Sequence, residues 1–350
     1  MGKNKVIIPT GYMGSGSSAI TDLLGEIEGI DTSKGSFEYV FLHCPNGVFD
    51  LEDKLLMGNN AVRSDEALHE FYHTMCQLYD KKYWWVGHYR ENVGEKFLKV
   101  TERYLKEIIQ FCPEFYWYYQ ENVTPKMVPQ LVFNKTAGKL PGMNKHVKKA
   151  LKYSPMWISF VTPEEFYNTT KKYIYKVLEL LGKNEKHIVL DQLLLPFNLF
   201  RMDHYFNDDA VVFVVERDPR DVFIINKYFW SKSDSLVPYP TDVEQFCKYY
   251  SRLRQIEKPC TNKNVHRIKF EDLIYHYEDT VAQILKDLDM DKEMHTKIKT
   301  KFIPEKSIKN TQLFNLNEEY AKECKIIEER LGEYLYDFPY EFKEKERTIF

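Results

Sequence analysis

The fold is decided by residues 5–24, which read Lys5-Val6-Ile7-Ile8-Pro9-Thr10-Gly11-Tyr12-Met13-Gly14-Ser15-Gly16-Ser17-Ser18-Ala19-Ile20-Thr21-Asp22-Leu23-Leu24. A short β-branched run opens this stretch, a turn rich in glycine and serine follows, and the last six residues fit a helix with its apolar side facing inward. We therefore expect a strand, a tight turn and a helix, which is the opening unit of an α/β sheet.

Further along the chain, apolar runs alternate with helical patterns. Residues 187–191 and 210–215 have the composition of strands buried on both faces, and a further strand is expected at 265–270. Helical patterns cover residues 163–181, 242–257 and the region from 278 onward. This order predicts the α/β class, with a central parallel sheet flanked by helices.

We interpret residues 1–350 as a single domain that contains a helical and aromatic insertion at residues 60–160. The helical patterns of this insertion lie at residues 66–78 and 97–111, and its aromatic run at 115–119 stands near a lysine-rich stretch at 139–152. We interpret this insertion as a cap over the substrate side of the site, because aromatic rings can stack on a ligand and lysines can steer an anionic chain. The alternative is that the aromatic side chains belong to the core.

Bulk composition excludes several classes of partner and points to a cytoplasmic protein. With a net charge of −3 and a pI near 6.4, the chain has no overall attraction to nucleic acid, so an anion site must be a local cluster of basic groups. The six cysteines form no C-x-x-C pair and no apolar leader precedes Val6, which favours reduced thiols in a cytosol. No apolar run is long enough for a membrane span.

The turn at residues 11–18 is a candidate phosphate site. Its glycines allow a tight backbone turn that aims successive N–H groups at an anion, and the hydroxyl groups of Ser17 and Ser18 add two donors. The alternative is a plain strand-to-helix connection. No Gly-Lys-Ser/Thr ends the turn, so it is not the triphosphate-binding loop of kinases and ATPases.

A second candidate anchor is Arg217, at the end of the apolar run 210–215 and followed by Asp218-Pro219. An arginine at the carboxyl edge of a parallel sheet can bind a phosphate with its forked guanidinium. The alternative is an Arg–Asp pair that only caps the next helix.

These two segments carry a resemblance to the sulfotransferase family. The strand, Ser15-Gly16-Ser17-Ser18 and helix resemble the family's 5′-phosphosulfate loop, and Arg217-Asp218-Pro219-Arg220-Asp221-Val222 resembles its 3′-phosphate motif. Lys269-Phe270-Glu271-Asp272-Leu273 and the late segment Phe302–Asn310 resemble two further family segments, in the same order. The resemblance implies a P-loop-like α/β fold, and transfer of a sulfuryl group from 3′-phosphoadenosine 5′-phosphosulfate (PAPS) to a hydroxyl or amine by in-line displacement without a metal.

The resemblance also implies positions for the nucleotide, whose product form is 3′-phosphoadenosine 5′-phosphate (PAP). It assigns the 5′-phosphate to Gly14, Ser15, Gly16, Ser17 and Ser18. The 3′-phosphate falls to Arg217, Lys309 and Ser307, with Asn310 in the same late segment. The chain departs from the family twice. Gly14 stands where a Lys or Arg is usual, so either another cation, such as Lys34 or Lys306, reaches the site or transfer is slow. Ile225 stands where a serine is usual, so the adjacent Asn226 is the expected substitute.

For the base that activates the acceptor, the resemblance offers carboxylates. Glu38, followed by aromatic residues, matches the glutamate of glycan-type members, and Asp191 is the second candidate because the histidine of small-molecule members is absent from the matching stretch. His43 is a weaker choice, and Glu38 could instead be a surface or capping residue. The expected acceptor is therefore a saccharide or related polyol.

Two alternatives come from other classes. His69-Glu70-Phe71-Tyr72-His73 fits the H-E-x-x-H pattern of zinc peptidases, although an amphipathic helix explains it equally well. The missing basic residue at Gly14 would also fit a nucleotide-binding protein without catalysis.

Overall fold

A computed structural model describes residues 4–35, 37–80, 86–113, 125, 128–137, 155–232 and 237–343. Its centre is a sheet of five parallel strands in the order β2-β3-β1-β4-β5. The strands are β1 (Val6–Gly11), β2 (Ile30–Asp31), β3 (His187–Val189), β4 (Ala210–Glu216) and β5 (Val265–Lys269). The expected α/β class and parallel sheet are thereby confirmed. The two-residue β2 was not expected, because so short a pairing leaves no apolar run in the sequence.

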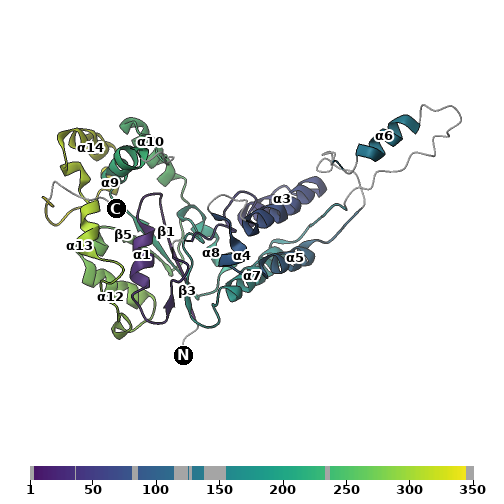
Figure 1. The fold of residues 1–350 in the computed structure, drawn as a ribbon, viewed down its shortest axis with the longest axis horizontal. Coiled ribbons are helices and arrows are strands. Elements are labelled where there is room, and N and C mark those ends of the chain that lie inside the picture. The colour runs from purple at the N-terminus through teal and green to yellow at the C-terminus, as the bar shows by residue number, and fades with distance from the viewer. Residues whose placement is uncertain are drawn as a thin grey trace.

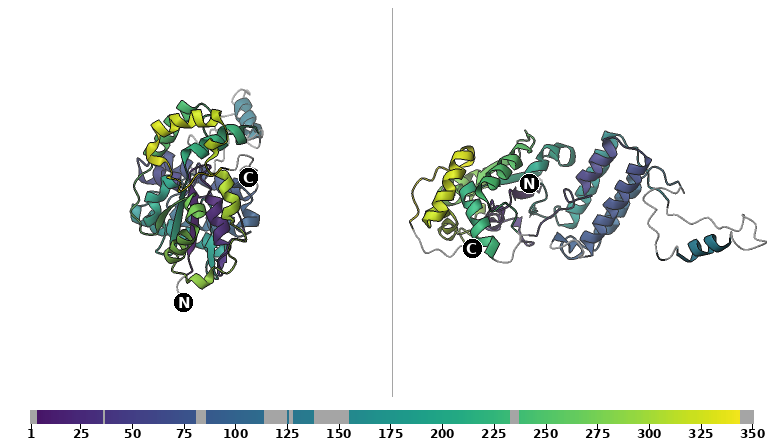
Figure 2. Two further views of the ribbon diagram at one scale, coloured as in Figure 1. Left: turned by 90° about the vertical axis from the view of Figure 1, so that its left-hand side faces the viewer. Right: turned by 90° about the horizontal axis from the view of Figure 1, so that it is seen from above.

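Helices surround this sheet, and the molecule is elongated (Figures 1 and 2). The sheet end carries α1 (Ser17–Leu24), α9 (Pro219–Ile224), α10 (Val243–Gln255), α11 (Asp272–Tyr275), α12 (Tyr277–Asp287), α13 (Pro304–Ser307) and α14 (Glu318–Arg330). The other end is built from α2 (Val48–Leu56), α3 (Ala61–Tyr79), α4 (Tyr89–Asn92), α5 (Phe97–Ile108), α7 (Pro163–Leu180) and α8 (Met202–Tyr205). Helix α6 (Val128–Ala137) stands apart from both (Figure 1).

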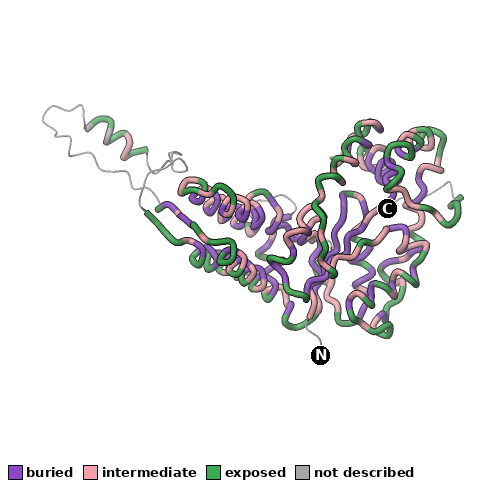
Figure 3. Tube along the Cα trace, turned by 180° about the vertical axis from the view of Figure 1, so that it is seen from behind, coloured by how far each residue is buried: buried purple, intermediate pink, exposed green. Residues whose placement is uncertain are grey.

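The two faces of the sheet bury two separate apolar clusters, because successive side chains of a strand point to opposite faces. Val6 and Ile8 belong to the cluster that the sheet shares with α2, α3, α5 and α7. Ile7 and Phe213 belong to the cluster shared with α1 and α12. A third cluster joins α9, α10 and α14. The central strands are accordingly buried along their length (Figure 3).

The helical part of the predicted insertion is present as α3 and α5. Both helices contribute to the same apolar cluster as β1, through Phe71 and Phe97 among others, and so pack into the main body. Because these helices share a core with the sheet, we still propose that the chain forms a single domain. The aromatic run 115–119 and the lysine-rich stretch 139–152 lie outside the described residues. No helix in the described part of the chain has the length and hydropathy that crossing a bilayer requires.

Candidate functional site

A cleft of about 630 Å³ opens where β1, β3 and β4 end. Its lining includes Gly11 to Gly14 and Gly16 to Ser18 of the turn after β1, Asp191 and Gln192 after β3, and Arg217 directly after β4. Because the carboxyl ends of parallel strands meet at one edge of the sheet, residues far apart in sequence converge there. The structure thus brings the turn and Arg217 to one cleft.

Two glycines of the turn take a backbone conformation that other residues rarely adopt. Gly14 has φ +79° and Gly16 has φ +89°. A Cβ atom at Gly16 would lie 2.9 Å from a ring carbon of Phe270, so the ring leaves no room for a side chain. Gly16 is the residue before α1 and provides no side-chain cap, and the first turn of α1 has no acidic residue. The helix therefore presents its N-terminal N–H groups and the positive end of its dipole to the cleft.

Not every residue of the turn faces the cleft. Ser15 is buried: its N–H donates to the Tyr12 carbonyl oxygen over 2.8 Å, and its Oγ has no partner among the described residues. Gly14, Gly16, Ser17 and Ser18 do line the cleft. Ser15 therefore lies on the buried side of the turn, whereas the four residues around it form the side that faces the cleft.

Arg217 connects three segments. Its guanidinium donates to the Gly14 carbonyl oxygen over 3.2 Å and to the Asn310 carbonyl oxygen, and it lies over the Phe270 ring with its Cζ 4.6 Å from the ring centroid. The side chain is buried, and its Nε has no partner among the described residues. Burial lowers the pKa of Arg217, while the charges of Asp221 and Glu271 oppose that shift. Arg217 thus carries a positive charge to the cleft and ties the turn to the late segment.

The late segment reaches this site through Asn310. Its backbone oxygen accepts from Arg217, and its Oδ1 is buried without a partner in the described residues. Lys306, Ser307 and Lys309, on α13 and the 3-10 turn Ile308–Asn310, are not in the lining of the cleft, and the Lys306 side chain is exposed. Their contacts with a nucleotide stay predictions.

Asn226 lies elsewhere than expected. It is fully buried in the π-helical turn Ile225–Phe229, where its amide donates to the Tyr239 carbonyl oxygen over 3.0 Å and accepts from the Tyr239 N–H over 3.2 Å. Tyr239 in turn lines the cleft and donates its hydroxyl to the Met13 carbonyl oxygen over 2.9 Å. The expected contact between Asn226 and a phosphate is therefore corrected. The side chain of Asn226 instead holds Tyr239, which forms part of the wall of the cleft.

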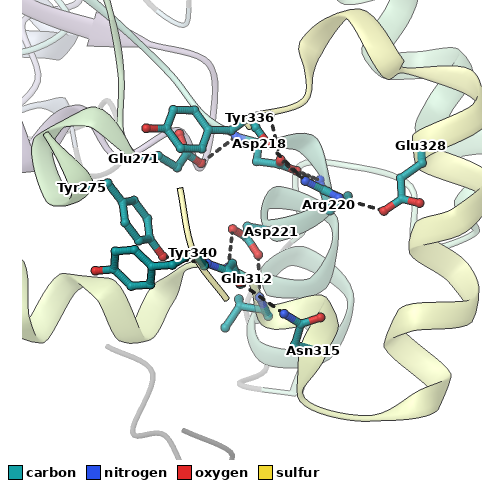
Figure 4. Close-up of polar contacts among 11 residues, drawn as sticks. Asp218, Arg220, Asp221, Glu271, Tyr275, Gln312, Asn315, Glu328, Tyr336 and Tyr340 are labelled. Atoms are coloured by element: carbon teal, nitrogen blue, oxygen red, sulfur yellow. Dashed lines mark hydrogen bonds and ion pairs between the residues drawn. The ribbon is translucent and has the colours of Figure 1, made fainter. Parts of the chain in front are cut away.

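The rest of the Arg217–Val222 motif holds the C-terminal region (Figure 4). Asp218 caps α9 and pairs with Arg220 over 2.7 Å, and Arg220 reaches Glu328 of α14 over 2.7 Å. Asp221 accepts from the backbone N–H groups of residues 312 and 313. The helix-capping alternative is therefore correct for Asp218, while Arg217 alone of this motif lines the cleft.

Two carboxyl groups share the cleft with the turn. Asp191 is 4% exposed and its Oδ1 has no partner in the described residues, while Glu38 is half-buried and lines the same cleft. Burial first, and then the negative charge of Glu38, raises the pKa of Asp191 to about 7. The two predicted bases therefore interact, and the pKa of Asp191 lies in the neutral range.

The third candidate base, His43, also lines the cleft. Its Nε2 lies 2.8 Å from the Gln192 carbonyl oxygen, and since a carbonyl only accepts, Nε2 carries the hydrogen. Burial lowers the pKa of His43, so the ring is held neutral. This bond engages one of the two ring nitrogens of His43.

The cation that would replace the residue missing at Gly14 is not at the site. Among the lining residues within the described ranges, Arg217 is the only arginine and there is no lysine. Lys34 lies outside the lining, and its ammonium donates to the Glu91 carbonyl oxygen over 3.3 Å. The cleft walls are instead aromatic, from Phe197, Trp230, Tyr239 and Tyr249. Sequence patterns missed these walls, because the four residues come from short turns and one helix without a shared motif.

The H-E-x-x-H match lies on α3 and is used structurally. His69 stacks on Trp157 with ring centroids 3.9 Å apart and its Nδ1 lies 2.9 Å from the Asp65 carbonyl oxygen. His73 Nε2 lies 3.0 Å from the amide nitrogen of Gln77. Within the described residues, no three His, Cys, Asp or Glu side chains gather as metal ligands would. The zinc peptidase alternative therefore has no site there.

Known proteins show the family of the chain. A family model described as "Sulfotransferase family" matches residues 46–294, well over half of the chain and including Asp191 and Arg217. No curated protein matches the chain.

Solved structures were compared as well. The sulfotransferase domain of an olefin synthase from Synechococcus PCC 7002 is 12% identical, with 97% of this chain and 98% of that chain covered and a TM-score of 0.36. Sulfotransferase STF9 from Mycobacterium avium is 13% identical, with coverages of 97% and 78% and a TM-score of 0.38. Sulfotransferase STF1 from Mycobacterium tuberculosis H37Rv is 14% identical, with coverages of 89% and 76% and a TM-score of 0.32.

Proposed function

Since the chain belongs to the sulfotransferase family, we propose that it transfers a sulfuryl group from PAPS to a hydroxyl group of a saccharide or related acceptor. The observation that carries this proposal is the single cleft that contains the turn, Arg217 and the Glu38–Asp191 pair. A donor-binding half and a base are then within reach of one reacting group, as a direct transfer requires.

The nucleotide half of the proposal assigns the two phosphates to two ends of the cleft. The 5′-phosphate lies at the start of α1, where the N–H groups and hydroxyls of Ser17 and Ser18 are donors and the helix dipole favours negative charge. The 3′-phosphate lies toward Arg217, whose Nε has no partner among the described residues and whose charge attracts the anion.

The proposed reaction is an in-line displacement at sulfur. A carboxylate of the Glu38–Asp191 pair takes the proton of the acceptor hydroxyl as its oxygen forms a bond to sulfur, while the bond from sulfur to the phosphate oxygen of the donor breaks. The N–H groups at the start of α1 stabilise the charge that develops on the leaving phosphate. Asp191, whose pKa is about 7, is suited to this role, because a base works best when its pKa lies near the operating pH.

A saccharide is the proposed acceptor because of the base and the cleft walls. The candidate base is a carboxylate pair, whereas the ring of His43 is bonded to a backbone carbonyl. Trp230 and Tyr249, which line the cleft and are not buried, offer rings on which a sugar can stack.

The test is a transfer assay with radiolabelled PAPS and a panel of neutral and anionic oligosaccharides, with simple phenols and amines as competitors. We expect saccharide product from the wild type, and a loss of about 100-fold or more in the Glu38→Gln/Asp191→Asn double variant, because a positioned base contributes at least that factor. Asp208→Asn, at an exposed position, is the matched control and should keep wild-type activity. Unchanged transfer by the double variant would exclude the carboxylate base, and transfer confined to phenols or amines would exclude the saccharide acceptor.

A further inference from the structure

Gln192 connects the two halves of the cleft, and its own backbone is unusual. It has φ +58°, the left-handed region that residues other than glycine rarely occupy and that is strained unless its surroundings hold it. Its N–H donates to the Pro9 carbonyl oxygen over 3.0 Å, and its carbonyl accepts from His43. The position is thus fixed from two sides, directly after Asp191.

The side chain of Gln192 then bridges a hydroxyl group of β1 and a hydroxyl group of the phosphate turn. Its Nε2 donates to the Ser17 Oγ over 3.0 Å, and its Oε1 accepts from the fully buried Thr10 hydroxyl over 3.1 Å. A serine hydroxyl has one hydrogen and two lone pairs. Because Gln192 occupies a lone pair of Ser17, the hydrogen of that hydroxyl must point elsewhere, and no acceptor for it is present among the described residues.

Ser17 is the first residue of α1 and lines the cleft, so the direction left for its hydrogen is toward a ligand there. We propose that Gln192 is a positioning residue that turns the Ser17 hydroxyl into a dedicated donor for the 5′-phosphate of the bound nucleotide. In the alternative orientation, the Gln192 amide is flipped and the Ser17 hydroxyl donates to Oε1. An ionised phosphate has only acceptor atoms, so a bound phosphate favours the orientation in which Ser17 keeps its hydrogen for the ligand. The inference rests on the proposed function, because it needs a phosphate at the start of α1.

This role also bears on the missing basic residue at Gly14. Position 14 is a glycine, and no lysine lines the described part of the cleft. The 5′ end of the cleft instead has a chain of hydrogen bonds between neutral groups, which runs from Thr10 through Gln192 to Ser17. Hydrogen bonds in such a chain polarise one another, so each donates more strongly than it would alone. Gln192 thus contributes to the binding of the leaving phosphate without touching it.

The test is calorimetry with PAP and with adenosine 3′-monophosphate, which lacks the 5′-phosphate. Gln192→Met keeps the length of the side chain and removes its polar atoms. We expect it to weaken PAP about tenfold, the size of one hydrogen bond to a charged group, and to leave adenosine 3′-monophosphate within about twofold. In a Ser17→Ala background, Gln192→Met should cause no further loss. Gln192→Glu should weaken PAP more, because the carboxylate takes the Ser17 hydrogen and repels the phosphate.

Three outcomes would overturn the inference: an equal loss for both nucleotides, a loss that persists in the Ser17→Ala background, or no loss at all. The first two would mean that Gln192 only supports the local fold. If the wild type binds neither nucleotide, the proposed function fails, and the inference fails with it. Because the wild type is measured in the same series, failure of the inference alone is distinguishable from failure of the proposed function.

Discussion

Replacing Asp191 with asparagine should stabilise the protein at high pH while removing a proposed base. The carboxyl is buried beside Glu38, which makes ionisation unfavourable in the fold. An asparagine has nearly the same shape and never ionises, so it avoids that cost. Active sites often keep such an unfavourable group because the reaction needs it.

The magnitude follows from the pKa of Asp191, which rises from 3.8 to about 7 on folding. A group with a raised pKa in the fold binds its proton more tightly in the native state, so the stability that Asp191 contributes is fully present below about pH 4 and is lost as pH rises to about 7. The full loss is roughly 4 kcal/mol at about 1.4 kcal/mol per pH unit. Between about pH 5.5 and pH 8, the advantage of Asp191→Asn over the wild type should therefore grow by roughly 2 kcal/mol.

Urea unfolding at these two pH values measures the effect, with Asp208→Asn as the matched control. Asp208 is exposed, so its substitution should change the free energy of unfolding equally at both values. An advantage of Asp191→Asn that stays constant or shrinks between about pH 5.5 and pH 8 would refute the reasoning, because the carboxyl would then ionise in the fold without cost.

Three further predictions concern the base, the turn and the motif. Glu38→Gln removes a negative charge that raises the pKa of Asp191. The rise of kcat/KM with pH, measured on the activity that remains in this variant, should therefore move to lower pH. A pH profile that stays in place or moves to higher pH would contradict the interaction between Glu38 and Asp191. Gly16→Ala adds a Cβ atom 2.9 Å from a Phe270 ring carbon at a residue with a positive φ. The substitution should lower the free energy of unfolding by roughly 2 kcal/mol and weaken PAP binding. Wild-type values in thermal unfolding and calorimetry would show that the turn tolerates a side chain. Arg220→Ala leaves the buried carboxylate of Asp218 without its ion pair and should lower the free energy of unfolding by roughly 3 kcal/mol. Limited proteolysis should then cleave the chain after residue 330 sooner than in the wild type. An unchanged cleavage pattern would argue against the role of this motif in holding the C-terminal region.

The sheet was predictable from the sequence because buried parallel strands leave a clear signal. The runs at 187–191, 210–215 and 265–270 became β3, β4 and β5 with ends within two residues of the expected ones. Helix α5 ends at Ile108 rather than at Phe111, because the apolar spacing continues into an irregular segment. Strand β2 was missed because two paired residues carry no periodicity.

The site was predictable in its anchors and not in its details. The turn and Arg217 follow strands, so the topology alone implies that they meet. Asn226 was expected to contact a phosphate only because it follows Ile225, but successive helical residues point in different directions, and the buried side chain of Asn226 bonds the backbone of Tyr239. Gln192 had no sequence signal, since its role depends on a left-handed backbone angle that many glutamines do not adopt.

The central claim is that the turn and Arg217 hold the two phosphates of one nucleotide. Calorimetry of PAP and of adenosine 5′-monophosphate against wild type and Arg217→Lys tests it most directly, with Arg220→Lys as the control within the same motif. A lysine cannot bridge the Gly14 and Asn310 carbonyls and still present a fork, so we expect Arg217→Lys to weaken PAP by about 2 kcal/mol, roughly 30-fold, and to affect the 5′-monophosphate far less. Equal affinity of the wild type and Arg217→Lys for PAP, or no binding of PAP by the wild type, would contradict the account.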